Sequence, residues 1–97
     1  MGYYVTMNRN KLDIAEICEI TQKLKNSEEI EKFFSEIFTQ NELEVLERRW
    51  RILKMLSSGK TQREVAKNLN VSLCNVTRGA KILKDHTAVV SKYMIKE

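Results

Sequence analysis

The sequence predicts an all-α chain of six helices with no strands. Its 97 residues include no proline and only three glycines, the residue types that most often interrupt helices. Leu, Ile, Glu and Lys recur at intervals of three and four residues, a spacing typical of amphipathic helices. No stretch rich in Ser, Pro or Gly divides the chain, so we expect residues 1–97 to form a single domain.

The first two expected helices, Lys11–Lys25 and Ser27–Phe38, carry wide apolar faces. The first has apolar side chains at Leu12, Ile14, Ala15, Ile17, Cys18, Ile20 and Leu24. The second has them at Ile30, Phe33, Phe34, Ile37 and Phe38. A small monomer usually buries a narrower stripe of each surface helix. We therefore expect a homodimer in which residues 11–58 supply the dimerisation helices; a tighter monomeric bundle is the alternative.

The third expected helix begins at a capping box and ends before a glycine. Thr39 and Glu42 have the spacing at which two side chains satisfy free backbone N–H groups reciprocally. The helix runs to Ser57, and Gly59 stands where a glycine commonly ends a helix.

An arginine occupies the middle of the apolar stripe of this helix. Arg49 has apolar neighbours one turn before it and one turn after it, at Val45, Leu46, Ile52 and Leu53. We therefore expect its side chain to be half buried, and a half-buried guanidinium needs a partner. An ion pair within the chain, an exposed position at the edge of the stripe and stacking on an aromatic ligand all remain open.

Residues 61–84 have the pattern of a helix–turn–helix. Gln62–Leu69 has the one-faced apolar spacing of a short helix, and Asn70 tolerates the left-handed backbone of a tight turn. Ser72 can cap a second helix that runs to Lys84. In DNA-reading units of this layout, the start of the second helix meets the base edges. An ordinary helical hairpin is the alternative.

A glycine lies on the inward face of this second helix. We expect the helix to bury Leu73, Val76 and Leu83. Gly79 falls one turn after Val76, although a glycine inside a helix costs about 1 kcal/mol relative to alanine. Either a neighbouring helix or a ligand must use the space that its missing side chain leaves.

The two ends of the chain are less informative. A final helix is expected over Thr87–Lys96, where Val89, Val90, Tyr93 and Met94 supply an apolar face. Residues 1–8 are expected to be disordered, with a free arm near DNA as the alternative.

Charge is distributed unevenly along the chain. Residues 10–47 hold four Lys/Arg against ten Asp/Glu, whereas residues 48–84 hold ten Lys/Arg against only Glu64. The basic half contains the helix–turn–helix, and positive charge around such a motif indicates a phosphate-backbone partner. The sequence therefore predicts binding to double-stranded DNA.

Several other classes are disfavoured. No apolar run approaches the roughly 20 residues of a membrane-spanning helix, and the first eleven residues are too polar for a signal peptide. Cys18 and Cys74 have no metal-ligand spacing, so we expect no metal and a reduced, cytoplasmic setting. His86 has no acid or nucleophile arranged with it, so we expect no enzymatic activity. Cys74 is interpreted as a packed or merely tolerated small residue, with a redox-sensitive thiol as the alternative.

Two segments of the chain resemble the tryptophan repressors, bacterial aporepressors of aromatic amino-acid genes. They are FTQNELEVLERRWRILKMLSSG and KTQREVAKNLNVSLCNVTRGAKILK, and the TQRE and VTRG pieces are the most specific. The resemblance implies a six-helix fold and an intertwined homodimer. It also implies a repressor of tryptophan genes that binds a palindromic operator when L-tryptophan is bound as corepressor.

The resemblance also implies the residues of a ligand site. The indole would lie between Arg49 and Arg78 and pack against Gly79, and Arg78 would pair with the ligand carboxylate. Thr39 would assist at the carboxylate, and carbonyl groups near Ile37 and Phe38 of the other subunit would face the ammonium group. The full expected ligand set is Arg49, Arg78, Gly79, Thr39, Ile37, Phe38, Ile82 and Leu53.

The expected DNA-binding residues fall into two groups. Candidates for phosphate contacts are Gln62, Arg63, Lys67 and Lys84. Candidates for direct or water-mediated base readout are Ser72, Leu73, Cys74, Asn75 and Thr77.

Departures from the family pattern keep other functions open. Ile82 stands where some members have a serine near the ammonium group, and the link from Gly59 to Gln62 is one residue shorter than in better-known members. The chain could be a DNA-binding regulator that answers another small ligand or none. An interaction protein whose basic face binds RNA or an acidic partner is a third possibility.

Overall fold

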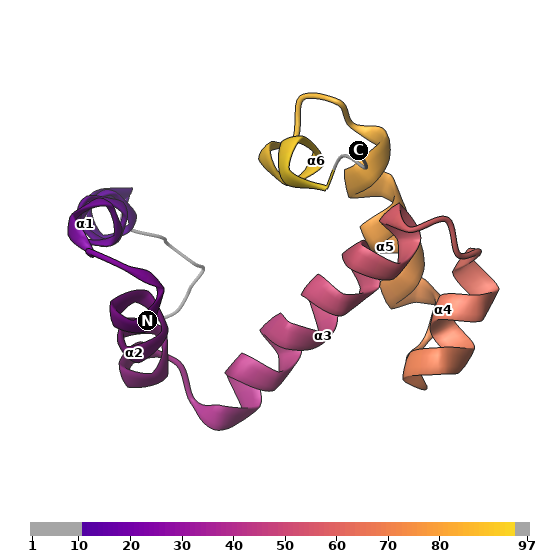
Figure 1. Ribbon diagram of the computed structural model, residues 1–97, viewed down its shortest axis with the longest axis horizontal. Helices are drawn as coiled ribbons and strands as arrows, with labels where there is room; N and C mark the ends of the chain where they lie inside the picture. Colours follow the sequence, from indigo (N-terminus) through magenta and orange to yellow (C-terminus); the bar gives the residue numbers. More distant parts are fainter. Residues whose placement is uncertain (1–10, 95–97) are drawn as a thin grey trace. The chain divides into compact units, whose positions relative to one another are not determined.

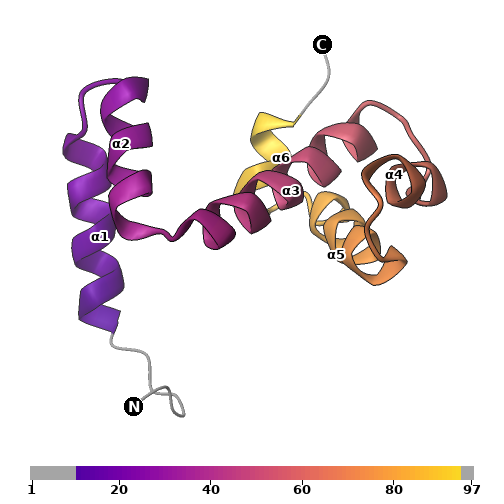
Figure 2. The ribbon, with the colours of Figure 1, turned by 90° about the horizontal axis from the view of Figure 1, so that it is seen from below.

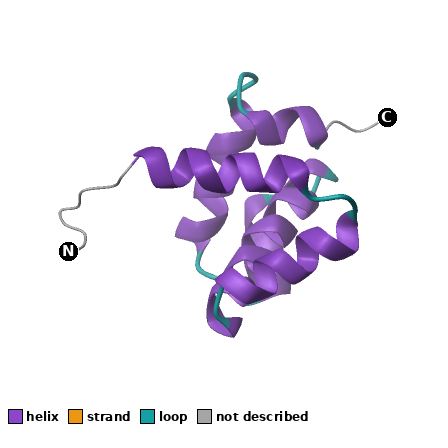
Figure 3. Ribbon diagram, turned by 90° about the vertical axis from the view of Figure 1, so that its left-hand side faces the viewer, coloured by secondary structure: helices purple, strands orange, loops and turns teal. Residues whose placement is uncertain are grey.

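The computed structural model describes residues 11–94, which form six helices and no strands (Figure 1; Figure 3). The all-α prediction is confirmed for this part of the chain. The expected arm or disorder of residues 1–8 lies outside the described residues. In chain order the helices are α1 Lys11–Lys23, α2 Ser27–Ile37, α3 Gln40–Ser57, α4 Gln62–Leu69, α5 Leu73–Lys84 and α6 Val89–Tyr93.

Four helix ends differ from the sequence prediction. α1 ends two residues early because Asn26 caps α2, accepting a hydrogen bond from the Glu29 N–H at 2.9 Å. α2 ends one residue early, since Phe38 is already extended. α6 begins two residues later than predicted because the Asp85 carboxylate accepts hydrogen bonds from the Thr87 N–H and hydroxyl and holds that residue in a turn. α6 also ends at Tyr93, three residues before the predicted Lys96, because the backbone of Met94 is no longer helical.

The chain divides into two compact units, residues 1–39 and residues 40–97. The described part of the first unit contains α1 and α2 and buries no residue. Leu12 is 74% exposed, and Ile14, Ile17, Ile20, Ile37 and Phe38 are also exposed. Two helices alone therefore leave these apolar faces uncovered, as the wide spacing predicted. The expected single domain and the homodimer stay predictions.

The second unit has a small core where α3, α4 and α5 meet, and α6 packs against α5 (Figure 2). Ile52 of α3, Val65 of α4 and Val76 of α5 are its buried residues. The partly buried side chains packed around them are Met55, Leu56, Ala66, Leu69 and Val71. The predicted burial of Val76 is confirmed, but Leu73 is 46% exposed. Leu73 is the first residue of α5, one turn before the part of the helix that reaches the core.

The two turns of this unit follow the sequence closely. Gly59 has φ +104°, and the Gly59 and Lys60 N–H groups donate to the carbonyls of Leu56 and Met55 at 3.1 and 3.3 Å. This pattern of two bonds is a Schellman motif, which ends α3 at the predicted glycine. Asn70 has φ 54°, the left-handed conformation expected of it, and the Ser72 hydroxyl accepts from the Asn75 N–H at 3.3 Å to cap α5.

A second capping box, not predicted, starts α4. The Thr61 N–H donates to Glu64 Oε1 at 2.8 Å, and the Glu64 N–H donates to the Thr61 hydroxyl at 3.1 Å. The residues Thr61-Gln-Arg-Glu64 carry the same pattern as Thr39-Gln-Asn-Glu42, so the signal was present in the sequence. The box predicted at Thr39 stays a prediction.

We expect the Thr61 box to make stability depend on pH. The backbone N–H and then the hydroxyl of Thr61 lower the pKa of Glu64 from its ordinary 4.5. A lowered folded-state pKa gives stability that is present above the unfolded-state pKa and is lost as the pH falls through the folded-state value. Chemical unfolding of wild type and Glu64→Gln should therefore show a stability difference at neutral pH that shrinks below about pH 4.5. A difference independent of pH would contradict this assignment.

Candidate functional site

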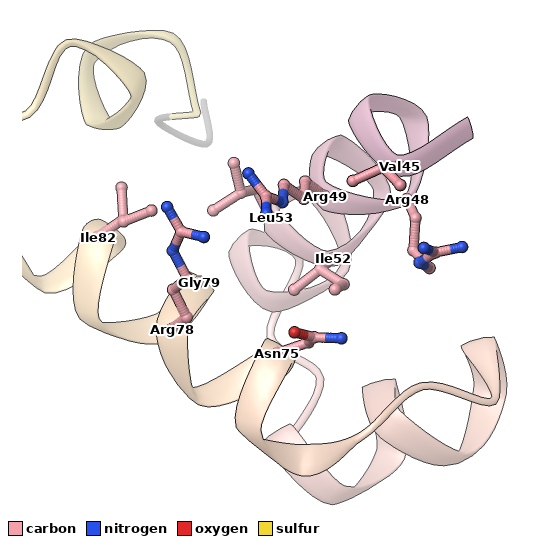
Figure 4. Close-up of a pocket in the computed structure, with 9 residues that line it drawn as sticks. All are labelled: Val45, Arg48, Arg49, Ile52, Leu53, Asn75, Arg78, Gly79 and Ile82. Carbon is pink, nitrogen blue, oxygen red and sulfur yellow. The ribbon is translucent and has the colours of Figure 1, made fainter. Parts of the chain in front are cut away.

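A cavity of about 350 Å³ lies between α3 and α5 of the second unit. Its lining residues are Val45, Arg48, Arg49, Ile52, Leu53, Asn75, Arg78, Gly79 and Ile82 (Figure 4). Five of them were expected from the sequence to bind a ligand: Arg49, Leu53, Arg78, Gly79 and Ile82. Packing of α5 against α3 brings together lining residues that are up to 37 positions apart in the chain, from Val45 to Ile82.

Two arginines from different helices face this cavity. Arg49 comes from α3 and Arg78 from α5, and Figure 4 shows both side chains directed into the space between the helices. Neither is recorded in an ion pair with any residue of the described range, so the ion-pair alternative for Arg49 is not realised there. Two guanidinium planes beside an apolar wall can take a flat ligand between them and pair with a carboxylate.

The predicted half-burial of Arg49 is wrong for the chain taken alone. Its side chain is exposed, and its neighbours Val45 and Leu46 are 37% and 42% exposed. Other helices of the second unit bury the side chains of Ile52 and Leu53 on α3, but they leave Arg49, one turn earlier, exposed. The apolar stripe around Arg49 is therefore open on its N-terminal side.

Gly79 serves both the helix packing and the cavity. It is buried, and a Cβ at this position would lie 3.0 Å from Ile52 Cγ2 and 3.6 Å from both Leu53 Cδ2 and Leu56 Cδ1. A contact of 3.0 Å is tighter than carbon atoms ordinarily make. The close approach of α5 to α3 thus favours a glycine here, and the same residue lines the cavity.

Sequence reasoning missed four lining residues. Val45 and Ile52 supply apolar wall, Asn75 had been assigned to DNA alone, and Arg48 had been counted only in the basic block. Arg48 is partly buried, unlike its neighbour Arg49. The signal for Arg48 was its helical spacing, since Val45 and Ile52 stand three residues before it and four after it.

Three expected ligand residues belong to the first unit. Ile37 is 51% exposed, and Phe38 and Thr39 are exposed as well. Their participation in the ligand site stays a prediction.

The residues expected to bind DNA lie on the helix–turn–helix with their side chains accessible. Ser72, Leu73, Cys74, Asn75 and Thr77 are exposed at the start of α5, and Arg63, Lys67 and Lys84 are exposed on α4 and α5. Cys74 is not packed, because its thiol is free and exposed, so the interpretations as a tolerated small residue and as a redox-sensitive thiol both stay open.

One hydrogen bond joins the two helices of this motif. The Thr77 hydroxyl donates to Gln62 Oε1 at 3.0 Å, so two residues expected at DNA also hold α4 against α5. The bond uses the amide oxygen of Gln62 and leaves its NH₂ group as a donor for an acceptor such as a phosphate.

Within residues 11–94, no group of three or more His, Cys, Asp or Glu side chains is placed to hold a metal ion. No helix in the same range is long and apolar enough to cross a membrane.

Comparison with known proteins identifies the family. The sequence model of the Trp repressor protein family matches residues 12–96. The chain is 36% identical over 73 residues to a Trp operon repressor homolog of Chlamydia caviae, an alignment covering 74% of this chain and 69% of the relative. It is 35% identical over 71 residues to the Trp operon repressor homolog of Xylella fastidiosa strain M23, covering 72% and 77%. No solved structure matched significantly.

The family match includes every residue of the cavity and of the helix–turn–helix. The relatives are named as repressors, and the family is one of transcriptional repressors rather than of enzymes. The all-helical architecture of residues 11–94 agrees with that assignment. On these grounds the chain belongs to the Trp repressor protein family.

Proposed function

We propose that this protein is a homodimeric transcriptional repressor that binds a palindromic DNA operator when L-tryptophan occupies the cavity between α3 and α5. The observation that carries the proposal is that Arg49, Arg78 and Gly79 line one cavity behind the helix–turn–helix. A flat ring between the two guanidinium groups, with its carboxylate on Arg78, accounts for all three residues.

The position of the cavity supports gating of DNA binding. Arg78 and Gly79 belong to the same helix as the base-reading candidates Asn75 and Thr77. A ligand that bridges α3 and α5 therefore favours one orientation of α5, and it acts only as far as it binds the DNA-competent orientation better than others.

Dimerisation would cover the exposed apolar faces of α1 and α2 and would supply a second DNA-reading helix. The exposed apolar faces of α1 and α2 offer a surface that a second copy can cover. Two copies related by a two-fold axis would present their α5 helices to half-sites about 34 Å apart on the duplex. Carbonyl groups near Ile37 and Phe38 of one subunit are then proposed to face the ligand of the other.

A second candidate keeps the DNA binding and changes the ligand. Ile82 lines the cavity, and the side-chain oxygen of Asn75 is the only one among the nine lining residues. The side chains that line the cavity in this unit thus offer few hydrogen-bond acceptors to an ammonium group. An aromatic acid without that group is the alternative ligand that this observation favours.

Calorimetric titration of the purified dimer with L-tryptophan, and with indole-3-propionate as a control without the ammonium group, tests both candidates. Saturable binding of L-tryptophan, together with tighter binding of a duplex selected by the liganded protein, is the expected result. Binding of the control alone would favour the second candidate. Heat from neither ligand in a folded dimer would reject the proposed gating.

A further inference from the structure

Arg48 lines the same cavity as Arg49 and Arg78 but lies apart from that pair. Figure 4 shows the Arg48 side chain on the opposite side of Ile52 from Arg49 and Arg78, with Asn75 of α5 beneath Ile52. One aromatic ligand held between Arg49 and Arg78 therefore leaves the Arg48 guanidinium without a role in the proposed function.

The surroundings of Arg48 fit an anion from outside the chain. Its side chain is partly buried, and no ion pair is recorded for it among residues 11–94. The carboxylate one turn earlier on α3, that of Glu44, accepts instead from the Gln40 amide at 3.4 Å. A partly buried guanidinium without a carboxylate partner favours an anionic ligand that can accept several hydrogen bonds.

The residue that shares the cavity with Arg48 on α5, Asn75, points to the source of that anion. Asn75 stands in the first turn of α5, where its N–H is held by the Ser72 cap. The first turn of the second helix of this motif is the part that approaches the duplex. Asn75 thus lines the cavity and also stands in the turn of α5 that is expected at DNA, and Arg48 lines the same cavity from α3.

We propose that Arg48 contacts a phosphate of the DNA backbone, so that α3, a helix outside the helix–turn–helix, helps to set the register of α5 on the duplex. Arg48 is on this view a positioning residue that carries no sequence information. The inference rests on the DNA binding proposed above. It extends the DNA surface to a helix that also lines the ligand cavity.

The salt dependence of DNA binding tests this role. Each phosphate contact contributes about 0.9 to the slope of log affinity against log salt concentration, so a dimer that loses two contacts loses about 1.8. We expect Arg48→Gln to show this loss in the presence of saturating L-tryptophan, measured by fluorescence anisotropy on a 30-base-pair duplex. The ratio of the wild-type DNA affinity to that of the variant should therefore fall about twelve-fold between 50 and 200 mM salt.

Two further variants make the test specific. Arg51→Gln removes the same charge from the exposed side of α3, away from the cavity, and is expected to change the slope little. Arg48→Lys keeps the charge and should restore most of the slope, although it loses the two-pronged geometry of arginine.

The outcomes separate this inference from the proposed function. An unchanged slope in Arg48→Gln, with weaker L-tryptophan binding by calorimetry, would overturn it and make Arg48 a ligand residue. Equal slope losses in Arg48→Gln and Arg51→Gln would also overturn it, because net charge alone would then explain the effect. Failure of wild type to bind duplex DNA would reject the proposed function and this inference together.

Discussion

Replacing Arg78 by alanine is expected to lower the affinity for L-tryptophan more than any other single change in the cavity. The variant loses charge-assisted hydrogen bonds to the ligand carboxylate and the guanidinium face against the ring. Together these interactions are worth about 2–4 kcal/mol, or about 30- to 1,000-fold in the dissociation constant. Arg78 is exposed, so we expect little loss of folding stability. Calorimetry for affinity and thermal unfolding for stability separate the two effects.

Two controls accompany this measurement. Arg78→Lys keeps the positive charge but neither the planar fork nor the stacking surface, so its affinity should fall between those of wild type and Arg78→Ala. Arg51→Ala removes an arginine from α3 outside the cavity and should bind L-tryptophan as wild type does. If Arg78→Ala binds as tightly as Arg51→Ala, the ligand does not lie between the two arginines.

Replacing Gly79 by alanine is expected to impair ligand binding far more than folding. The added Cβ would meet Ile52 Cγ2 at 3.0 Å, and overpacking of this kind costs about 1–3 kcal/mol. Alanine recovers about 1 kcal/mol of helix propensity over glycine, which offsets part of that cost. The methyl group also occupies the wall against which the ring is proposed to pack, so we expect at least about a ten-fold loss of L-tryptophan affinity.

The adjacent position supplies the matched control for Gly79. Ala80 does not line the cavity, and Ala80→Gly should lose about 1 kcal/mol of stability through helix propensity while its L-tryptophan affinity stays unchanged. A Gly79→Ala variant that is destabilised yet binds L-tryptophan normally would show that this glycine serves only the packing of α5 on α3.

The local structure of this chain could be predicted from the sequence because its signals are short-range. Asn70 takes the left-handed turn, Ser72 caps α5 and Gly59 ends α3, as their positions predicted. Each depends on a backbone conformation or a hydrogen bond within a few residues, which neighbouring residue types determine. The missed capping box at Thr61 has the same local origin and carried the same signal.

The burial of individual side chains was predicted less well. Leu73 shares a helix face with Val76, yet only Val76 is reached by α3 and α4. Arg49 lies among apolar residues, yet no helix of the second unit covers the part of α3 that precedes it. Helical spacing tells which residues share a face, but it does not tell how far along that face a neighbouring helix extends.

By itself, then, the sequence determined the helical class, the turn–cap pattern of residues 59–72, the basic half of the chain and the two unusual residues Arg49 and Gly79. Only the tertiary structure decided that a Cβ added at Gly79 would lie 3.0 Å from Ile52 Cγ2. It also decided that Arg48 and Asn75 line the cavity. The reason is physical. Caps and turns are set by contacts between near neighbours in the chain, whereas a cavity is set by the distance and rotation of two packed helices, which depend on side chains more than 20 residues apart.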